Sequence, residues 1–469
     1  MKKCVIFGAG TMGQRAFYKI SENYEIQYYI DNDIRLWGGS VGGIRIISPT
    51  EFEEKILDKS ILIVVSCMAY REIVSQLREM GYYNIKILLE GLLYEYEKDN
   101  LLIPDSNNKI TYFRKRKKEK NILFVQNRPC IRTNKIAMLM KQKGYKVYLL
   151  YTEAPTVDKS KEYEEIYNQV FTVWTQAEIV EFVNRSEFDI LHCSNAPDCL
   201  GALLVNSNKP MVYDCHDMES LQGKNSLAIL TLEHIVNTQS EGVIYTSDGV
   251  KDIAIKKFGR EDKDIFVLEN MIMKQLDRKN YSKLSKKDGE IHCVYEGGIN
   301  GKDINSDRYF ENIWNKIVAE GIHIHFYSQS DEHYCLELEK KSKYLHYEGN
   351  KSTKELVSEM TKYDCGLAVF NVNSSNQVFL ETGTANKMYE YINAGLPVLV
   401  GNVQSYIDFV NRYNVGMYLD LNSDIYRQIE KACKLKIEDD FLEAHSLTME
   451  SKLNELEKFY QKIIDKYNL

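Results

Sequence analysis

The segment ETGTANKMYEYINAGLPVLVGN, residues 381–402, has the residue types and spacing of an anion-binding site. Thr384 or Asn386 can cap a helix that begins near Asn386, and Gly395 followed by Pro397 ends it before the strand VLVG. The loop before the helix therefore directs free backbone N–H groups and the positive end of the helix to one place. Such a place binds phosphate and similar anions.

Glu390 adds a second chemical group to this segment. Met388, Tyr391 and Ile392 are spaced to form the buried face of the predicted helix, and Glu390 lies on a different face one turn along. Its carboxylate can accept hydrogen bonds from a ribose diol while the helix N-terminus holds the phosphates. The alternative is an ordinary strand–helix connection with a solvated Glu390.

A second glycine-rich turn lies at the start of the chain, in MKKCVIFGAGTMG. Gly8, Gly10 and Gly13 follow an apolar strand and open a helix, and Asp31 stands at the end of the next strand, close to where a ribose-binding acid belongs. An oxidoreductase would need a second catalytic half before the linker, and the sequence has none. Asp31 also begins an Asp-x-Asp sequence ending at Asp33, which we interpret as an acid-tipped turn rather than a metal site.

The bulk properties are those of an ordinary globular protein. With 469 residues the chain should form two to three domains, and we expect three. The net charge of −7 gives no reason to expect a nucleic-acid partner. We expect no signal peptide and no membrane-spanning segment. The ten cysteines form no Cys-x-x-Cys pair, which favours reduced core thiols and a cytoplasmic protein.

Apolar runs of four to six residues alternate with helical periods in three series, which predicts an α/β fold with three Rossmann-like domains and a C-terminal helix that packs back. The predicted boundaries are 1–95 for a nucleotide-binding type of domain, 96–119 for a linker, 120–285 and 286–435 for two further domains, and 436–469 for C-terminal helices.

The run NKMYEYINAGLPVLV resembles the donor-site signature of GT-B glycosyltransferases of the family 4-like group. The fragments FDILHCSNAPDCLGALL, PMVYDCHDME, SEGVIYTSDGVKDIAIKKFG and VYEGGI resemble other parts of that family, in the same order, over residues 121–435. The resemblance implies a GT-B pair of domains, acceptor then donor. It also implies transfer of a sugar from a UDP- or GDP-sugar with retained configuration, without a required metal or cofactor.

The resemblance also implies roles for single residues. Glu390 would bind the ribose, Gly297-Gly298 would let the backbone approach the sugar diphosphate, and Gly349-Asn350 would lie beside the nucleobase. Thr384 and Asn386 belong to the predicted anion loop described above. His216, in YDCHD, matches the histidine at the cleft face of the acceptor domain, although a hydrogen-bonded structural histidine is the alternative.

Two departures from the family pattern concern charge. The family carries an Arg and a Lys just beyond the glycine turn, where this chain offers Lys302 and Arg308 at an unfamiliar spacing, and Lys387 could substitute for them. Such cations are needed because departure of a nucleoside diphosphate builds negative charge. The first acid of the family pattern would fall on Thr382, and Glu381 is one position away.

The front of the chain resembles the small Rossmann-like domain of bacterial sugar-modifying proteins in surface polysaccharide pathways. It either holds a nucleotide or nucleotide sugar through Gly8, Gly10, Gly13 and Asp31, or serves as a ligand-free docking module. The basic run at residues 114–118 is either a solvated linker or a peripheral contact with anionic lipid.

The leading hypothesis is therefore a hexosyltransferase that acts on a glycan, lipid-linked or protein acceptor in bacterial surface glycan assembly, in the cytoplasm or at the inner face of the membrane. A nucleotide-sugar epimerase and a non-catalytic GT-B partner subunit are the alternatives. The sequence sets neither the donor sugar, the acceptor nor the oligomeric state.

Overall fold

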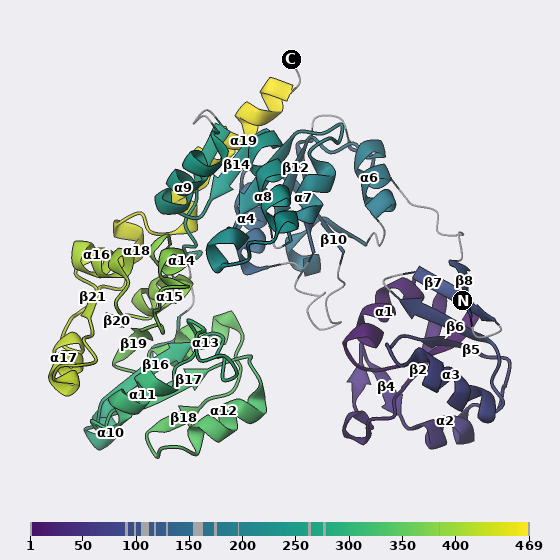
Figure 1. The fold of residues 1–469 in the computed structure, drawn as a ribbon, viewed down its shortest axis with the longest axis horizontal. Coiled ribbons are helices and arrows are strands. Elements are labelled where there is room, and N and C mark those ends of the chain that lie inside the picture. Colours follow the sequence, from purple (N-terminus) through teal and green to yellow (C-terminus); the bar gives the residue numbers. More distant parts are fainter. Residues whose placement is uncertain are drawn as a thin grey trace. The chain divides into compact units, whose positions relative to one another are not determined.

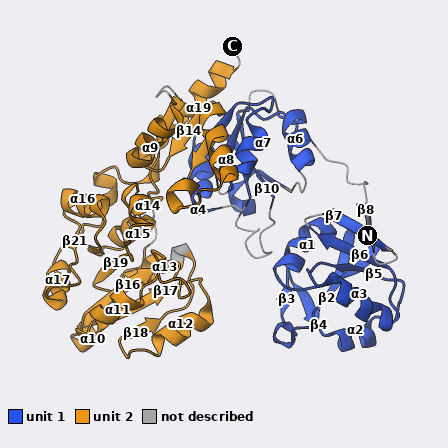
Figure 2. Ribbon diagram, viewed as in Figure 1, with its two compact units in different colours: residues 1–212 blue, residues 213–469 orange. Residues whose placement is uncertain are grey.

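A computed structural model gives the structure of the chain, which forms two compact units, residues 1–212 and 213–469 (Figure 2). The residues it describes are 2–89, 92–97, 100–104, 112–116, 119–127, 130–152, 163–172, 176–195, 197–260, 264–274, 278–383 and 385–467.

The first sheet lies in the N-terminal unit (Figure 1). Its strands are, in spatial order, β3 (Ser40–Val41), β4 (Ile44–Ile47), β2 (Tyr24–Ile30), β1 (Lys2–Phe7), β5 (Leu62–Val65), β6 (Ile85–Leu89), β7 (Leu92–Glu97) and β8 (Asn100–Pro104). Its helical segments are α1 (Thr11–Ser21), η1 (Ile34–Leu36), α2 (Pro49–Lys55) and α3 (Tyr70–Glu79). The central strands are parallel, while β7 and β8 add antiparallel and extend the sheet beyond residue 95, to Pro104.

The second sheet has the order β11 (Gln169–Thr172), β10 (Lys146–Tyr151), β9 (Asn121–Gln126), β12 (Ile190–Ser194), β13 (Met211–Cys215), β14 (Gly242–Tyr245) and β15 (Ile265–Val267). The accompanying helices are α4 (Ile131–Gln142), α6 (Gln176–Arg185), α7 (Cys199–Leu204), η2 (Glu219–Gln222), α8 (Leu227–Gln239) and α9 (Asp248–Phe258). Strands β9, β12 and β13 are buried along their whole length, as expected for the middle of a parallel sheet covered on both faces.

The third sheet has the order β18 (Leu345–Tyr347), β17 (His323–Tyr327), β16 (His292–Glu296), β19 (Cys365–Ala368), β20 (Val398–Val400) and β21 (Gly416–Tyr418), and its neighbouring strands pair in parallel. Its helices are α10 (Ser285–Asp288), α11 (Glu311–Val318), α12 (Glu332–Glu339), α13 (Thr353–Met360), α14 (Gln377–Glu381), α15 (Asn386–Asn393), α16 (Gln404–Tyr413) and α17 (Ile425–Ala432). Parallel strands carry their loops at the same edge, so residues that follow β16, β17 and β18 come together.

The chain ends in α18 (Phe441–Ala444), η4 (Met449–Lys452) and α19 (Leu453–Tyr467). Helix α19 packs back on the second sheet: a Cβ on Gly242 would lie 2.2 Å from Ile463 and 2.9 Å from Phe459. Lys462 and Lys466 also pair with Asp264, which precedes β15. The predicted fold class, three Rossmann-like α/β parts with a C-terminal helix that packs back, is confirmed.

Candidate functional site

The turn after β16 brings the backbone against a lysine from α15. Gly297 has a φ of +127°, and a Cβ there would lie 3.2 Å from Lys387 Nζ, so only glycine fits without displacing the lysine. The Gly297 N–H donates to the carbonyl of Tyr327 at 3.0 Å, which ties the end of β16 to the end of β17. The predicted residues Gly297 and Lys387 are thus neighbours.

Lys387 is a buried cation. It is 7% exposed, and its Nζ lies 3.9 Å from the ring centroid of Tyr295 and 4.9 Å from that of Phe370. Burial lowers the pKa of Lys387 to about 8, against the opposing effect of the nearby Glu296 carboxylate. Lys387 makes no hydrogen bond or ion pair within the described part of the chain. A buried ammonium without an anionic partner is costly, which favours an anionic ligand here.

Of the two other predicted cations, Arg308 is the one placed at the turn. A Cβ on Gly298 would meet Arg308 Nη1 at 2.7 Å, so the guanidinium lies directly against the glycine, and it lowers the pKa of Lys387 further by charge repulsion. Lys302 lies in the exposed part of the loop, where its backbone N–H donates to Asn300 Oδ1 at 3.0 Å. Arg308 and Lys387 are thus the predicted cations that the structure brings to the Gly297-Gly298 turn.

Tyr295 is a candidate functional residue that sequence reasoning missed. Its hydroxyl donates to the carbonyl of Gly298 at 2.7 Å while its ring faces the Lys387 ammonium. Tyr295 thus fixes both the glycine turn and the lysine. Its position, immediately before the Glu-Gly-Gly sequence at the end of a strand, was the available signal.

Helix α15 begins as predicted but is capped differently. Its N-cap is Ala385, without a side-chain cap, and Asn386 is the first helical residue, so the predicted capping role of Asn386 is wrong. Thr384 lies outside the described residues. The uncapped N-terminus leaves backbone N–H groups for a ligand. The helix ends as predicted, because Gly395 has a φ of +74° and its N–H donates to Ile392.

The other faces of α15 also follow the prediction. Met388, Tyr391 and Ile392 are buried, and Tyr391 fits because β19 carries Gly366, where a Cβ would lie 2.2 Å from the tyrosine ring. Glu390 is partly exposed, and its charge acts on Lys387. The structure therefore places Glu390 within electrostatic range of the cation that the anion site requires.

The predicted nucleobase residues lie at the same edge of the sheet, after β18. Gly349 has a φ of +76°, and its carbonyl accepts from the N–H of Ser328 after β17. Asn350 is exposed. Glu348 accepts a hydrogen bond from His325 Nδ1 at 2.7 Å, so its carboxylate already has a partner.

His216 follows β13 and pairs with an acid. Its Nε2 lies 2.9 Å from Oδ2 of the fully buried Asp214, and its carbonyl accepts from Thr246 at 3.3 Å. The next residue, Ser247, donates through its hydroxyl to the carbonyl of Thr382, just before the α15 loop. The structure thus connects the His216 turn with that loop through neighbouring residues.

Glu381 stands at the end of α14. Its carboxylate accepts from Gln377 Nε2 at 2.9 Å, within the same helix. The neighbouring Thr382 is 9% exposed and serves as the acceptor for Ser247. Glu381 therefore has a local partner, whereas Thr382 occupies the position that the family pattern gives to an acid.

The N-terminal glycine turn is built as the spacing predicts. Gly8 has a φ of +108°, and a Cβ on Gly13 would lie 1.5 Å from the Gly8 carbonyl oxygen. Gly10 is the N-cap of α1, and a Cβ on it would meet no atom within 4 Å, so that face of the turn is open. Asp31 accepts from the Ala9 N–H at 2.7 Å, which makes its carboxylate part of the turn itself.

The Asp-x-Asp sequence has local partners as well. Asp31 Oδ1 accepts from the Asp33 N–H at 2.8 Å, and the Asp33 carboxylate binds Arg35 at 2.6 Å. Hydrogen bonds from Arg35 lower the pKa of Asp33 to about 2. These contacts agree with the interpretation as an acid-tipped turn.

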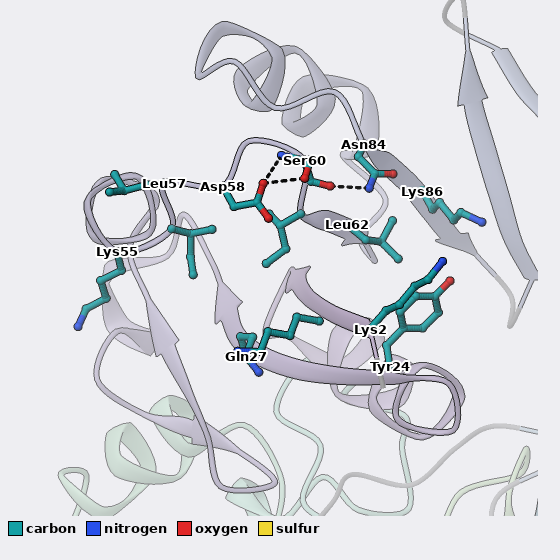
Figure 3. A pocket seen from close by; sticks show the side chains of 13 residues that line it. Lys2, Tyr24, Gln27, Lys55, Leu57, Asp58, Ser60, Leu62, Asn84 and Lys86 are labelled. Atoms are coloured by element: carbon teal, nitrogen blue, oxygen red, sulfur yellow. Dashed lines mark hydrogen bonds between the residues drawn. The ribbon is translucent and has the colours of Figure 1, made fainter.

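A pocket of about 680 Å³ lies in the first domain at the amino-terminal ends of its strands (Figure 3). Lys2, Tyr24 and Leu62 stand at the starts of β1, β2 and β5, and Asp58 and Ser60 are hydrogen bonded to each other along the wall. The glycine turn follows the carboxyl end of β1, so this pocket is separate from the predicted nucleotide turn.

Part of the basic run at residues 114–118 is tied to the second domain. Arg114 pairs with Glu187 at 3.2 Å, and Lys115 pairs with Asp189 at 2.6 Å. Lys117 and Lys118 lie outside the described residues. Within the described parts of the chain, no helix is long and apolar enough to cross a membrane.

Three family models match the chain in series. Residues 1–88 match "C2185-like, N-terminal", residues 133–274 match "Glycosyltransferase Family 4", and residues 306–447 match "Glucosyltransferase 3-like, C-terminal domain". No curated protein matches. The last two matches cover most of the second and third sheets, including α15, whereas β9, β16 and the Gly297-Gly298 turn lie outside them.

The chain is also similar to solved structures, one of them with a TM-score of 0.50. The complex of Anabaena Alr3699/HepE with UDP has 14% identity and a TM-score of 0.50, over 74% of this chain and 97% of that one. The complex of the same protein with UDP-glucose has 15% identity and a TM-score of 0.49, over 74% and 99%. A glycosyltransferase from Rickettsia africae has 12% identity and a TM-score of 0.46, over 74% and 99%.

Residues 133–274 thus resemble glycosyltransferase family 4, and the second and third α/β domains have the fold of GT-B glycosyltransferases. The predicted resemblance to GT-B glycosyltransferases of the family 4-like group is confirmed. The predicted enzyme class, a hexosyltransferase-type glycosyltransferase, is confirmed as well.

Proposed function

We propose that the protein transfers a hexosyl group from a nucleotide sugar to an acceptor hydroxyl, with the diphosphate of the donor bound between the Gly297-Gly298 turn and the start of α15. The observation that carries the proposal is Lys387, a buried ammonium with no hydrogen bond or ion pair among the described residues. A diphosphate supplies the missing negative charge.

In the proposed reaction the bond from the sugar to the diphosphate breaks and a bond from the acceptor oxygen to the sugar forms. The proton of the acceptor hydroxyl passes to an oxygen of the departing diphosphate. Negative charge grows on the departing diphosphate, where Lys387, Arg308 and the N–H groups of α15 would stabilise it. The Glu390 carboxylate would accept hydrogen bonds from the ribose hydroxyls. Gly349 and Asn350 would form the base-contacting loop, and His216 would face the transferred sugar.

The finer assignments follow the family resemblance. From that resemblance we infer a reaction that retains the configuration of the sugar. We also infer that it requires no metal, because the cationic groups named above would stabilise the negative charge of the leaving group. The UDP complex of Alr3699/HepE supports a UDP-sugar over a GDP-sugar for this chain as well. The front domain's resemblance supports a glycan or lipid-linked acceptor of bacterial surface glycan assembly, reached from the cytoplasm.

The deciding experiment combines binding with product analysis. UDP and GDP are titrated calorimetrically into the full chain, and a panel of UDP- and GDP-sugars is then incubated with it and analysed by mass spectrometry and NMR. We expect binding of one nucleoside diphosphate and acceptor-dependent release of the same diphosphate. A C2-inverted nucleotide sugar formed without acceptor would instead indicate an epimerase, and no diphosphate binding would contradict the proposed site.

A further inference from the structure

Four of the nine histidines lie together on three adjacent strands of the third sheet. His292 opens β16, His323 and His325 lie on β17, and His346 lies on β18. The register pairs His292 with His323 and His325 with His346. Because parallel partners, and residues two apart on one strand, share a face, all four imidazoles lie on the same face of the sheet.

The rings are packed closely with their nitrogens turned toward one another. His292 Nδ1 lies 2.9 Å from His325 Nε2, and His323 Nδ1 lies 2.7 Å from His346 Nε2. One ring nitrogen from each of His292, His323 and His325 falls within 4.8 Å of the other two. His292 and His325 are 4% and 6% exposed, so water competes little for these nitrogens.

Carboxylates bind the outer nitrogens of three of the rings. Asp288 lies 3.0 Å from His292 Nε2, Glu348 lies 2.7 Å from His325 Nδ1, and Glu290 lies 2.5 Å from His323 Nε2. A carboxylate accepts the ring N–H and thereby fixes the tautomer. A neutral ring whose outer nitrogen carries the proton has a lone pair on its inner nitrogen.

This arrangement creates an electrostatic conflict in the His292–His325 pair. With Asp288 and Glu348 each accepting an N–H, two lone pairs face each other across 2.9 Å. With these tautomers a cation between the rings relieves that repulsion, either an added proton or a metal ion. A proton serves two nitrogens at most, whereas a metal can also bind the inner nitrogen of His323, which exchanges its present neighbour, His346 Nε2 at 2.7 Å, for the ion.

We propose that His292, His323 and His325 bind one Zn²⁺ ion through one ring nitrogen each, with water in the fourth position. Imidazole suits zinc, and outer carboxylates of this kind accompany zinc-bound histidines. At Zn–N distances of about 2.0–2.1 Å, two nitrogens of a tetrahedral site are about 3.4 Å apart. The His292–His325 pair therefore opens by about 0.5 Å on binding, and the His323 nitrogen, which lies within 4.8 Å of the other two, moves closer by at most about 1.4 Å.

The site lies apart from the Gly297 turn, because His292 and His323 stand at the starts of β16 and β17 and the turn follows the end of β16. Its connection to the donor edge is Glu348, which binds His325 and directly precedes Gly349. A bound ion would therefore fasten β16 to β17 and hold Glu348 at the base of the predicted nucleobase loop. This inference does not depend on which nucleotide sugar the enzyme uses.

The test uses the full chain, stripped with a chelator and titrated with ZnCl₂ in a calorimeter. We expect about one zinc per chain with a Kd below about 1 µM. X-ray absorption on the zinc-loaded wild type should show three imidazole nitrogens at about 2.0–2.1 Å, a measurement that needs no variant. Binding of less than half an equivalent of zinc per chain, or an absorption spectrum without histidine ligands, would overturn the proposal.

Substitutions locate the site. H325Q and H292Q should each weaken zinc binding at least about a hundredfold, and Glu348→Gln about tenfold to a hundredfold. The matched control is His333→Gln on α12, an exposed histidine of the same domain outside the cluster, which should bind zinc like the wild type. Circular dichroism checks that each variant is folded, and wild-type affinity in folded H325Q would contradict the assignment.

Discussion

The Gly8 and Gly297 turns use the same backbone device for different purposes. Each ends an apolar parallel strand with a glycine of positive φ, +108° and +127°. In the first turn the nearby charge is an acid, and the Asp31 carboxylate already accepts from the Ala9 N–H. In the second the nearby charges include the buried Lys387, whose ammonium makes no hydrogen bond or ion pair among the described residues. The charged group of the first turn therefore already has a hydrogen-bond partner within the turn, whereas the buried ammonium at the second turn favours an anionic ligand.

The largest expected effect comes from removing the cation of the second turn. Lys387→Met should lower kcat/KM for the nucleotide sugar by about 10²–10³-fold, because a charge that stabilises the departing diphosphate is lost. The fold should persist, since methionine fills the volume of the lysine stem. Steady-state kinetics with a folded-state check by circular dichroism measures both.

Lys302→Met is the comparison for that variant, since Lys302 is the exposed lysine of the same turn. We expect kcat/KM to stay within about threefold of the wild type, because exposed substitutions rarely matter. An equal loss of kcat/KM in both variants would contradict the proposed difference between a buried and an exposed cation.

Substitutions in the first turn should change the stability of the first domain rather than the rate of sugar transfer. Gly13→Ala places a Cβ 1.5 Å from the Gly8 carbonyl oxygen, and we expect it to cost about 3 kcal/mol or more in the first domain. Gly10→Ala meets no atom within 4 Å and has a negative φ of −69°, so it should cost less than about 1 kcal/mol. Hydrogen exchange of β1 measures both, and equal protection in the two variants would contradict the geometry.

The pKa of Lys387 predicts opposite pH effects on stability and on binding. Because the folded pKa is about 8 and the unfolded one about 10.5, the unfolded chain binds the extra proton between these pH values. The free energy of unfolding should therefore rise from pH 8 to 10.5, by roughly 3 kcal/mol relative to Lys387→Met, and this difference should be constant below pH 8. Nucleoside diphosphate affinity should instead fall above pH 8, up to about tenfold per pH unit. Urea melts and calorimetry test these two slopes.

Glu390 should give the smallest of these effects. Glu390→Gln removes the charge that would accept from the ribose, and we expect donor KM to rise about tenfold to thirtyfold, or about 1.5–2 kcal/mol. Glu381→Gln is the matched control, because that carboxylate binds Gln377 on its own helix, and its KM should not change. A larger effect at Glu381 would show that the family's acid is displaced by one position.

The site was predictable from sequence as far as it is local. The glycines of both turns, the start of α15 at Asn386 and its end at Gly395 follow from backbone rules that act over a few residues. The prediction that Asn386 caps the helix was wrong. Several polar residues near a helix start can act as its cap, and the extended backbone at Ala385 makes that residue the N-cap and Asn386 the first helical residue.

The sequence by itself determined the α/β alternation, the order of the three Rossmann-like parts and the two glycine turns, since strand and helix periods are encoded within each segment. Only the tertiary structure decided which charges meet at each turn. Lys387 lies far beyond Gly297 along the chain, and the packing of α15 against the third sheet brings the two together. The clustered histidines come from three different strands, and the register of parallel strands brings them together. Interactions between charged groups depend on their distance in the folded chain, and for this reason only the tertiary structure could identify these partners.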